Sequence, residues 1–364
     1  MSEEKSSQHW RRARVLINSD ALLNNLNRVR DYSPKSRVMA VIKANAYGHG
    51  MLTAATVMDS ADMFAVAMPE EAFALRASGC TKPLLVLHGC NHVDELHRFS
   101  ALRISTVIHQ SQQLDELLES NLDTPIDAWL KVDTGMHRLG IPADDAEDYF
   151  GRLRNSPNVA KVYIMSHFAN ADHTDNELNN KQLETFLKVT NDIDVDCSMA
   201  NSAAIVAMPK SHFEVVRPGI MLYGSSPFPD VTAEQLGLQA VMQFEAELLS
   251  IKQLKAGDAV GYGSTYVANR DITMGIVAAG YGDGYPRHAR NGTPVWINEQ
   301  RCELLGRVSM DSISIDLTGV EASTGDRVVL WGRELCVDEI AAASETIAYE
   351  LMCNAGAAYF SIRQ

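Results

Sequence analysis

The sequence predicts an α/β protein. We expect a (β/α)8 barrel of the TIM type over residues 11–240, followed by a mainly β domain over residues 241–364. Over about 200 residues, short apolar runs alternate with stretches of helical spacing, as in parallel strands joined by helices. From about residue 240, helical spacing gives way to strand-like segments separated by Gly-Asp and Asn-Gly turns. On pattern alone, a doubly wound open sheet is the alternative for the first part.

Eight apolar runs in the first part are short enough to be buried strands. They occupy residues 38–42, 64–67, 84–87, 106–108, 128–132, 162–165, 197–200 and 215–223. Most of the intervals have helical spacing, as in residues 21–30, 69–79, 111–120 and 177–190. The segment 69–79 begins with Pro69 and two acids and ends at Gly79, which suits the two ends of a helix.

The second part contains shorter strand-like segments and one helix. The expected strands are 246–251, 273–277, 294–297, 312–317 and 327–330, and the expected helix is 337–343. Neither an internal repeat nor a low-complexity linker interrupts the pattern.

Composition limits the function classes. The 364 residues carry a formal net charge of −14, which argues against nucleic acid or an anionic membrane surface as a partner. The polar start of the chain has no apolar signal core, and no long apolar run follows it. The six cysteines form no CxxC pair, so we expect no disulfide framework and a cytoplasmic location.

Two segments imitate other kinds of site. Residues 88–97 are rich in His, Cys, Asp and Glu but match no zinc spacing, so we expect no metal site. Residues 280–284 read GYGDG after an expected strand, which suggests a nucleotide loop. Tyr285 and Pro286 follow in place of a helix, so a dinucleotide site is not expected.

The stretch AVIKANAYGHG places Lys43 at the end of the first expected strand. Apolar surroundings favour the neutral amine, which is a nucleophile able to form a Schiff base. Gly48 and Gly50 permit a sharp turn, and Tyr47 can supply a hydroxyl. The ordinary alternative is a lysine that extends to solvent.

Other polar residues follow the later strands. The active site of a parallel barrel lies at the carboxyl ends of its strands. Arg138 follows the fifth expected strand, His167 the sixth, and Asn201 and Ser202 the seventh, while Arg217 lies in the eighth region. Each alone is an ordinary structural polar group, but together with the lysine they form a convergent set.

The loops after the last two strands suit a phosphate. Barrels often bind phosphate there, through backbone N–H groups and hydroxyls. Ser202, Gly219 and Ile220 are placed accordingly, and Tyr47 could add a second hydroxyl.

Several segments together resemble the alanine racemase family. In order they read AVIKANAYGHG, KVDTGMHRLG, SHFANAD, ANSAA, VRPGIMLYG, GYGSTY, GYGDGYPR and GRVSMD. The resemblance covers nearly the whole chain. It implies a two-domain, pyridoxal-phosphate-dependent enzyme that interconverts L-alanine and D-alanine, the latter for peptidoglycan.

The resemblance assigns cofactor roles to the barrel residues. Lys43 would bond covalently to pyridoxal phosphate. Arg217 would donate to the pyridine nitrogen, with His167 in contact with it. The phosphate would be held by Tyr47, Ser202, Gly219 and Ile220, with Asn201 beside them.

The resemblance also assigns substrate and proton-transfer roles. Arg138 and the backbone of Met310 would receive the substrate carboxylate. Tyr281 would be the second catalytic base and would come from the partner chain of a homodimer. A phenol is mostly protonated at neutral pH, so on physical grounds we expect a nearby cationic Arg217–His167 pair to favour the phenolate. Lys131 matches a lysine that is carbamylated in some members and helps to orient Arg138.

Arg217 also bears on the type of reaction. An acid at the pyridine nitrogen keeps it protonated and makes the ring a strong electron sink. An arginine can only donate, so the nitrogen stays unprotonated, which should suppress transamination and favour reprotonation at Cα.

Three alternatives remain at this stage. The first is a serine or broad-specificity amino-acid racemase. The second is a basic amino-acid decarboxylase, in which we would expect an acid where Arg217 stands. The third is a non-catalytic cofactor-binding barrel, but such proteins lack the second part of this chain. The C-terminus departs from the family pattern, because Ala357 stands where some members have a tyrosine near the phosphate.

Overall fold

The computed structural model describes residues 12–191 and 193–360 and divides into two compact units. Within these residues, the barrel unit comprises 19–46, 51–191 and 193–239. The sheet unit comprises 12–18, 47–50 and 240–360. Residue 11 and residues 361–364 of the two expected domains lie outside the described residues.

The barrel unit is built on eight parallel strands in the order β10-β2-β3-β4-β5-β6-β8-β9. The last strand of the barrel unit, β10, pairs with the first, β2, which excludes the doubly wound alternative. Just beyond β9 and β10, the N–H of Arg217 donates to the carbonyl of Ala200 at 2.9 Å, so the two ends of the sheet nearly close into a barrel. The strands are β2 (Arg37–Val41), β3 (Met63–Val66), β4 (Leu84–Val86), β5 (Ser105–Ile108), β6 (Ile126–Asp133), β8 (Val159–Met165), β9 (Cys197–Ser198) and β10 (Val215–Val216), with β7 (Ile141–Pro142) beside β6.

One expected strand is much shorter than predicted. Residues 215–223 form a strand only at β10, and Ile220–Tyr223 form a 3₁₀ turn. Pro218 has no N–H to donate to a neighbouring strand, so the ladder ends before it. Ile220 and Gly219 are therefore presented by a turn beyond the strand.

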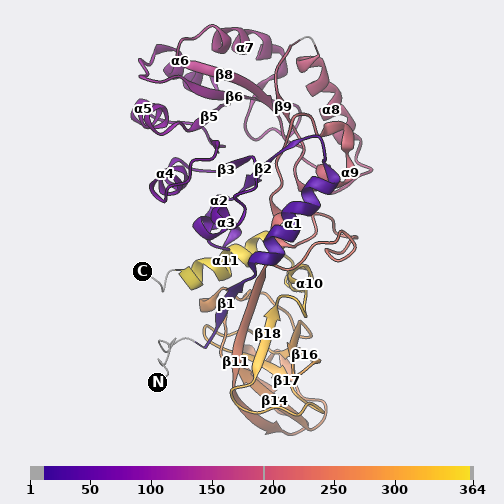
Figure 1. The fold of residues 1–364 in the computed structure, drawn as a ribbon. Coiled ribbons are helices and arrows are strands. Elements are labelled where there is room, and N and C mark those ends of the chain that lie inside the picture. The colour runs from indigo at the N-terminus through magenta and orange to yellow at the C-terminus, as the bar shows by residue number, and fades with distance from the viewer. Residues whose placement is uncertain (1–11, 192, 361–364) are drawn as a thin grey trace. The chain divides into compact units, whose positions relative to one another are not determined.

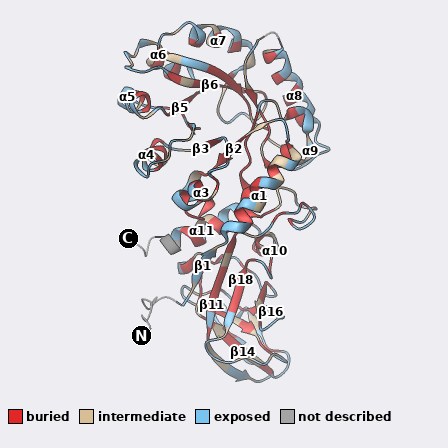
Figure 2. Cartoon of the chain, in the orientation of Figure 1, coloured by how far each residue is buried: buried red, intermediate tan, exposed pale blue. Residues whose placement is uncertain are grey.

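Helices surround the barrel strands, as the alternating pattern predicts. Figure 1 shows α4 to α8 in an arc around the strands, and Figure 2 shows buried residues on the strands and on the helix sides that face them. Among the described residues, no helix is long and apolar enough to cross a membrane. The helices of this part are α1 (Ser19–Tyr32), α3 (Met51–Val57), α4 (Pro69–Ala77), α5 (Val93–Leu102), α6 (Ser111–Glu119), α7 (Ala146–Arg154), α8 (Glu177–Thr190) and α9 (Ser202–Ala207).

The sheet unit is a seven-stranded antiparallel sheet in the order β1-β11-β14-β17-β16-β15-β18, in which β11 also pairs with β18. The mainly β second domain is therefore confirmed, although β16 and the final helix were not expected. Its elements are β1 (Arg14–Ile17), β11 (Met242–Leu254), β12 (Ala259–Val260), β13 (Tyr266–Val267), β14 (Ile272–Val277), β15 (Pro294–Ile297), β16 (Gln300–Leu305), β17 (Ile313–Asp316), β18 (Arg327–Trp331), α10 (Val337–Ala343) and α11 (Ala348–Phe360).

Strand β1 corrects the expected boundary, because residues 12–18 belong to the sheet unit and not to the barrel. β1 pairs antiparallel with β11, with Arg14 opposite Glu245. The carboxylate of Glu245 is buried and forms ion pairs with Arg14 at 2.6 Å and Arg327 at 2.9 Å. A buried carboxylate needs such partners, so this cluster fixes β1 and β18 to β11.

Candidate active site

Lys43 follows β2 at the carboxyl edge of the barrel and begins an unusual turn. The segment labelled α2 (Lys43–Tyr47) is left-handed, with φ of 51°, 53°, 55° and 53° over residues 44–47. This conformation costs about 1–2 kcal/mol for each residue other than glycine, so neighbouring contacts must hold it. One such contact is the hydrogen bond from Met51 N–H to the side chain of Asn45 at 2.8 Å. The direction in which Lys43 leaves the strand is therefore tightly constrained.

Tyr47 is buried in the sheet unit, where its ring lies 5.6 Å from that of Tyr349. Burial, with Tyr349 and Cys353 nearby, raises the pKa of its hydroxyl well above the usual value, so the group stays protonated and can donate. A Cβ at Gly48 would collide with the carbonyl of Met352, which explains the glycine after this tyrosine.

Arg217 is buried at the barrel edge, and several neighbours hold its guanidinium. It donates to the hydroxyl of Ser198 at 2.6 Å, to the carbonyl of Ser166 at 2.5 Å and to Nδ1 of His167 at 3.2 Å. The structure thus brings Arg217 and His167 together, as the sequence predicts. These bonds also fix the plane of the guanidinium.

The charge expected on this pair needs correction. Burial lowers the pKa of Arg217 to about 10, so this side chain remains a cation at neutral pH. Burial and the cations of Arg217, Lys131, Arg138 and Lys43 lower the pKa of His167 well below its usual value. His167 is therefore neutral, accepts at Nδ1 and contributes no positive charge. The expected cationic pair is a single cation.

Ser202 and Gly219 meet where a phosphate site is predicted. The Ser202 hydroxyl accepts from the N–H of Gly219 at 2.9 Å and from that of Met221 at 3.4 Å. Ile220, which lies between Gly219 and Met221 in the sequence, is fully buried. The Asn201 side chain caps α9 by accepting from that helix's backbone at 3.1 Å, so its position has a structural reason of its own.

Arg138 stands at the end of a loop organised by Asp133. One oxygen of Asp133 accepts from the N–H groups of Gly135, Met136 and His137 at 2.9, 3.1 and 3.1 Å. Its other oxygen lies 3.2 Å from Nδ1 of His137. Arg138 itself is exposed, so the loop holds a cation that is accessible to an anionic ligand.

Lys131 lies inside the barrel, only 9% exposed. Burial and the neighbouring cations Arg217, Arg138 and Lys43 lower the pKa of its amine to about 8. A substantial fraction of this amine is therefore neutral near pH 8. Carbamylation requires a neutral amine, so this environment is compatible with the modification implied by the resemblance.

Tyr281 and Met310 lie side by side in the sheet unit. Backbone bonds join their segments, from Tyr281 to Ser309 at 3.1 Å and from Gly282 to Met310 at 2.8 Å. A Cβ at Gly280 would collide with the carbonyls of Ser309 and Met310, so this approach requires glycine there. The side chains of Tyr281 and Met310 are 41% and 55% exposed.

A cavity of about 380 Å³ opens beside Tyr281 within the sheet unit. Its lining also includes Arg287, His288 and Glu350. Tyr281 is therefore next to a cavity with both polar and apolar lining, and it is not part of the buried core.

Both parts of the chain match known proteins. Residues 17–227 match the family model for the N-terminal domain of alanine racemase, and residues 241–362 match the model for its C-terminal domain. The chain belongs to the alanine racemase family. It is 46% identical over 344 residues to the biosynthetic alanine racemase of Escherichia coli strain K12, which covers 93% of this chain and 96% of that protein.

Further relatives of the alanine racemase family agree. The alanine racemase of Vibrio cholerae is 47% identical over 343 residues, which is 93% of this chain and 95% of that protein. The crystal structure of the biosynthetic alanine racemase from Pseudomonas aeruginosa superposes with a TM-score of 0.92 at 42% identity, covering 95% of this chain and 97% of that one. The barrel and the sheet unit are therefore those of this family.

The alanine racemase cofactor fits the donor set of the barrel edge. Both hydrogen bonds of Ser202 use its lone pairs, which leaves the hydroxyl hydrogen to donate to a phosphate oxygen. Arg217 offers a charged donor for a pyridine nitrogen and, unlike a carboxylate, cannot accept a hydrogen bond from a protonated one. Lys43 stands at the strand end where a covalent bond to an aldehyde would form.

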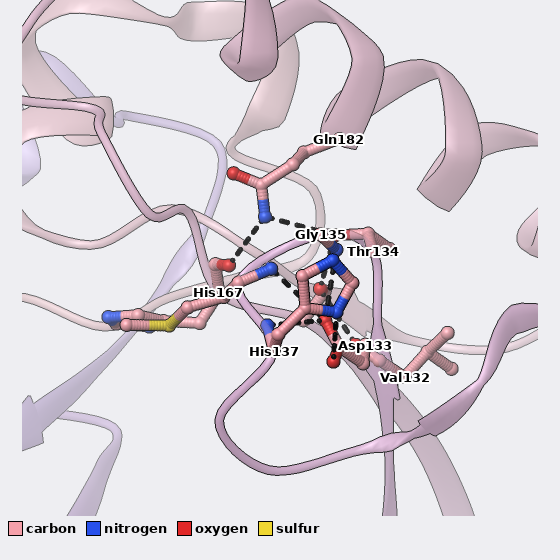
Figure 3. Close-up of polar contacts among 9 residues, drawn as sticks. Val132, Asp133, Thr134, Gly135, His137, His167 and Gln182 are labelled. Atoms are coloured by element: carbon pink, nitrogen blue, oxygen red, sulfur yellow. Dashed lines mark hydrogen bonds and ion pairs between the residues drawn. The ribbon is translucent and has the colours of Figure 1, made fainter.

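Sequence reasoning missed Gln182, a fully buried residue of α8. Figure 3 shows its amide nitrogen directed at the carbonyl of His167 and at Thr134, at 3.0 and 3.3 Å. Its amide oxygen accepts from the N–H of Ala169 at 2.9 Å. Both ends of the amide are used, so Gln182 holds the loop that carries His167. A glutamine in an amphipathic helix gives no sequence signal for this role.

The departure at the C-terminus falls on α11. Ala357 is exposed in this helix, and Tyr349 of the same helix has its ring next to that of Tyr47. The two tyrosine rings are tilted by 43° to each other. The effect of Ala357 on substrate choice stays a prediction.

Proposed function

We propose that this protein is a pyridoxal-phosphate-dependent alanine racemase that interconverts L-alanine and D-alanine and supplies D-alanine for peptidoglycan. The observation that carries the proposal is the buried, cationic Arg217 beside a neutral His167 at the edge where Lys43 emerges. It distinguishes a racemase from a basic amino-acid decarboxylase, for which an acid is expected at this place. The sheet unit with Tyr281 disfavours a non-catalytic barrel.

The barrel residues bind and orient the cofactor. When bound, pyridoxal phosphate withdraws electrons from the α-carbon of an attached amino acid and so acidifies its α-hydrogen. Lys43 would hold the cofactor through a covalent bond to its aldehyde carbon. Ser202, Gly219, Ile220 and Tyr47 hold the phosphate, with Asn201 beside them. Arg217 donates to the pyridine nitrogen.

Substrate binding uses the exposed cation of the Asp133 loop. Arg138 and the backbone N–H of Met310 bind the substrate carboxylate. The burial of Lys131 beside Arg138 favours the neutral amine, and a carbamate on it would supply the anion that orients Arg138.

Two bases move the proton. Lys43 serves one face of Cα, and the phenol of Tyr281 serves the other. A cofactor that is held rigidly cannot present both faces of the substrate Cα to a single base. We infer that the enzyme is a homodimer in which the partner subunit's Tyr281 completes the site. The cytoplasm, where reduced cysteines are stable, is its expected location.

Arg217 favours return of a proton to Cα, which is racemisation, over transamination. A guanidinium with a pKa of about 10 stays charged at neutral pH and only donates, so it leaves no proton on the pyridine nitrogen. An unprotonated pyridine nitrogen would withdraw fewer electrons, so Lys43 or Tyr281 would return a proton to Cα rapidly. Arg217→Glu should lower racemisation and increase transamination, seen as pyridoxamine phosphate by chromatography.

The proposal is tested with purified protein. Its absorbance spectrum should show bound pyridoxal phosphate, and borohydride reduction with peptide mapping should place the label on Lys43. A chiral assay should show alanine racemised fastest and serine more slowly, because serine adds a hydroxyl to a methyl-sized pocket; such a pocket distinguishes larger side chains by about 1–3 kcal/mol per methylene. Serine turned over as fast as alanine would indicate the broad-specificity alternative. A label on another lysine would contradict the site, and faster turnover of lysine or arginine would contradict the substrate.

A further inference from the structure

The turn after Lys43 must be stabilised by contacts from outside the turn. Four successive non-glycine residues, 44–47, have φ between 51° and 55°, a conformation that persists only where surrounding contacts fix it. The N–H of Ala44, the first of the four, points to a side chain of another element. Its acceptor is Oε1 of Glu71, at 2.6 Å.

Glu71 joins two neighbouring strand ends. Its other oxygen, Oε2, accepts from the N–H groups of Ala67 and Met68 at 2.9 and 3.1 Å. These residues form the connection from β3 to α4. Strands β2 and β3 are parallel neighbours, with Val41 opposite Ala65, so one carboxylate ties the ends of both strands together.

The simpler explanation is that Glu71 only caps α4. It is the third residue of that helix and reaches back to the N-cap position, Met68, as in a capping box. That task occupies Oε2 alone. The bond from Oε1 to Ala44 is additional and reaches 27 positions along the chain to the residue after Lys43.

The chemistry at this point requires a carboxylate. All three partners are N–H donors, so both oxygens must accept. A glutamine has one acceptor oxygen and one donor NH₂ group. The N–H groups of Ala67 and Met68 together compete with that of Ala44 for the single oxygen. We therefore expect the oxygen to stay with the cap and the NH₂ group to face the N–H of Ala44.

We propose that Glu71 is a positioning residue for Lys43. It holds the left-handed turn so that the lysine amine is presented to the aldehyde of pyridoxal phosphate. This inference rests on the proposed function. The residue touches neither substrate nor cofactor in this account and acts through the backbone of Ala44.

The test compares Glu71→Gln with Glu70→Gln. Glu70 is an exposed acid in the same first turn, so its variant removes the same charge from the same helix. After cofactor removal and readdition, Glu71→Gln should attach pyridoxal phosphate to Lys43 at least tenfold more slowly than the wild type. Borohydride trapping and peptide mapping at successive times measure this rate. The kcat should fall by a similar factor, with KM for alanine changed less than twofold. Glu70→Gln should match the wild type in each respect.

A second substitution separates positioning from capping. Met68→Ser gives α4 a capping hydroxyl of its own, so it should restore any loss of melting temperature in the Glu71→Gln background. We expect the double variant to melt like the Met68→Ser single variant and yet still attach the cofactor slowly. Recovery of the attachment rate together with the melting temperature would show that Glu71 is only a cap and would overturn the inference.

A third readout does not depend on the cofactor. Hydrogen exchange of the peptide containing residues 43–50 should be at least tenfold faster in Glu71→Gln than in Glu70→Gln, because the N–H of Ala44 loses its acceptor. Unchanged exchange would contradict the positioning role even if the wild type proved not to bond pyridoxal phosphate. Failure of the wild type to bond it would contradict the proposed function alone.

Discussion

The two units present their candidate residues in opposite ways. In the barrel unit, Arg217 is 4% exposed and is held by three other side chains or carbonyls within 3.2 Å. In the sheet unit, Tyr281 is 41% exposed and Met310 is 55% exposed, and the bonds that position them are made by backbone groups. The barrel unit thus holds Arg217 in its interior, whereas the sheet unit exposes Tyr281 and Met310 at its surface.

This difference indicates what each half needs. Buried groups with fixed bonds are complete within the chain and contribute to its stability. Tyr281 and Met310 are exposed side by side, so both are accessible to another molecule. The contrast supports a site completed by a second subunit. Substitutions in the two halves should therefore affect stability and activity differently.

The largest effect is expected from Tyr281→Phe. Loss of one proton-transfer group should lower kcat by about 10²- to 10⁴-fold. Because the side chain is exposed, the free energy of unfolding should change by less than about 0.5 kcal/mol. Racemisation assays and urea unfolding measure the two quantities. A loss of stability beyond about 1 kcal/mol would mean that Tyr281 is part of the folded core and is not an exposed group.

Arg217→Ala should show the opposite balance. The carbonyl of Ser166 and the hydroxyl of Ser198 would lose a buried donor, so the free energy of unfolding should fall by about 2–4 kcal/mol. Activity should fall as well, because the pyridine nitrogen loses its partner. The matched control is Arg152→Ala, which removes an exposed arginine paired with Asp115 and should cost less than about 1 kcal/mol. Equal losses in the two variants would contradict the structural role of Arg217.

Gln182→Glu should have a smaller effect of the same kind. The change replaces a donor by an acceptor against the carbonyl of His167, which should lower the free energy of unfolding by about 1–3 kcal/mol. The displaced His167 loop should reduce kcat. Gln235→Glu is the control, because that exposed side chain uses only its oxygen, as acceptor for Thr232. Full stability in Gln182→Glu would show that the amide orientation is immaterial.

The smallest effect concerns pH and Lys131. Its folded pKa of about 8 lies below the usual value of 10.5, so between these values the unfolded chain binds more protons. Stability should therefore rise as pH increases from about 8 to 10.5, by roughly 1–3 kcal/mol, since one pKa unit is worth about 1.4 kcal/mol. Below pH 8 the amine is charged in both states, so the full cost of burying this charge remains and stability no longer changes with its titration.

Lys131→Met provides the comparison. It keeps a similar volume without the charge and should show a weaker pH dependence of urea unfolding. Bicarbonate should stabilise the wild type and not this variant, because a carbamate would place an anion among three cations. Identical pH profiles for the two proteins would contradict the lowered pKa.

The sequence predicts the strands and the convergence of the site well, because both depend on local patterns. The Val and Ile run before Lys43 and the polar residues after later strands are visible in the chain itself. The alternation of strands and helices then places these residues at one edge of the barrel. The sequence did not predict β1 or α11. For β1 the reason is that it has only four residues and that its partner strand lies more than 200 residues away.

The supporting groups could not be predicted for a related reason. The letters of ANAY favour an ordinary helix, and the left-handed turn depends on contacts such as that with Glu71. In the sequence, Glu71 reads only as an acid in the first turn of a helix. Gln182 reads as a polar residue of an amphipathic helix, and its partners come from two other loops. Neutral His167 likewise depends on burial and on cations from distant segments.

The central claim is that Lys43 of one chain works with Tyr281 of the partner subunit. Lys43→Ala and Tyr281→Ala dimers should each be nearly inactive, since each site lacks one base. When their subunits exchange, a hybrid has one site with both lesions and one with neither. Random exchange makes half of the dimers hybrid, so about a quarter of wild-type activity should return. Absence of recovery, with exchange confirmed by mass spectrometry, would place Tyr281 in its own chain's site or outside catalysis.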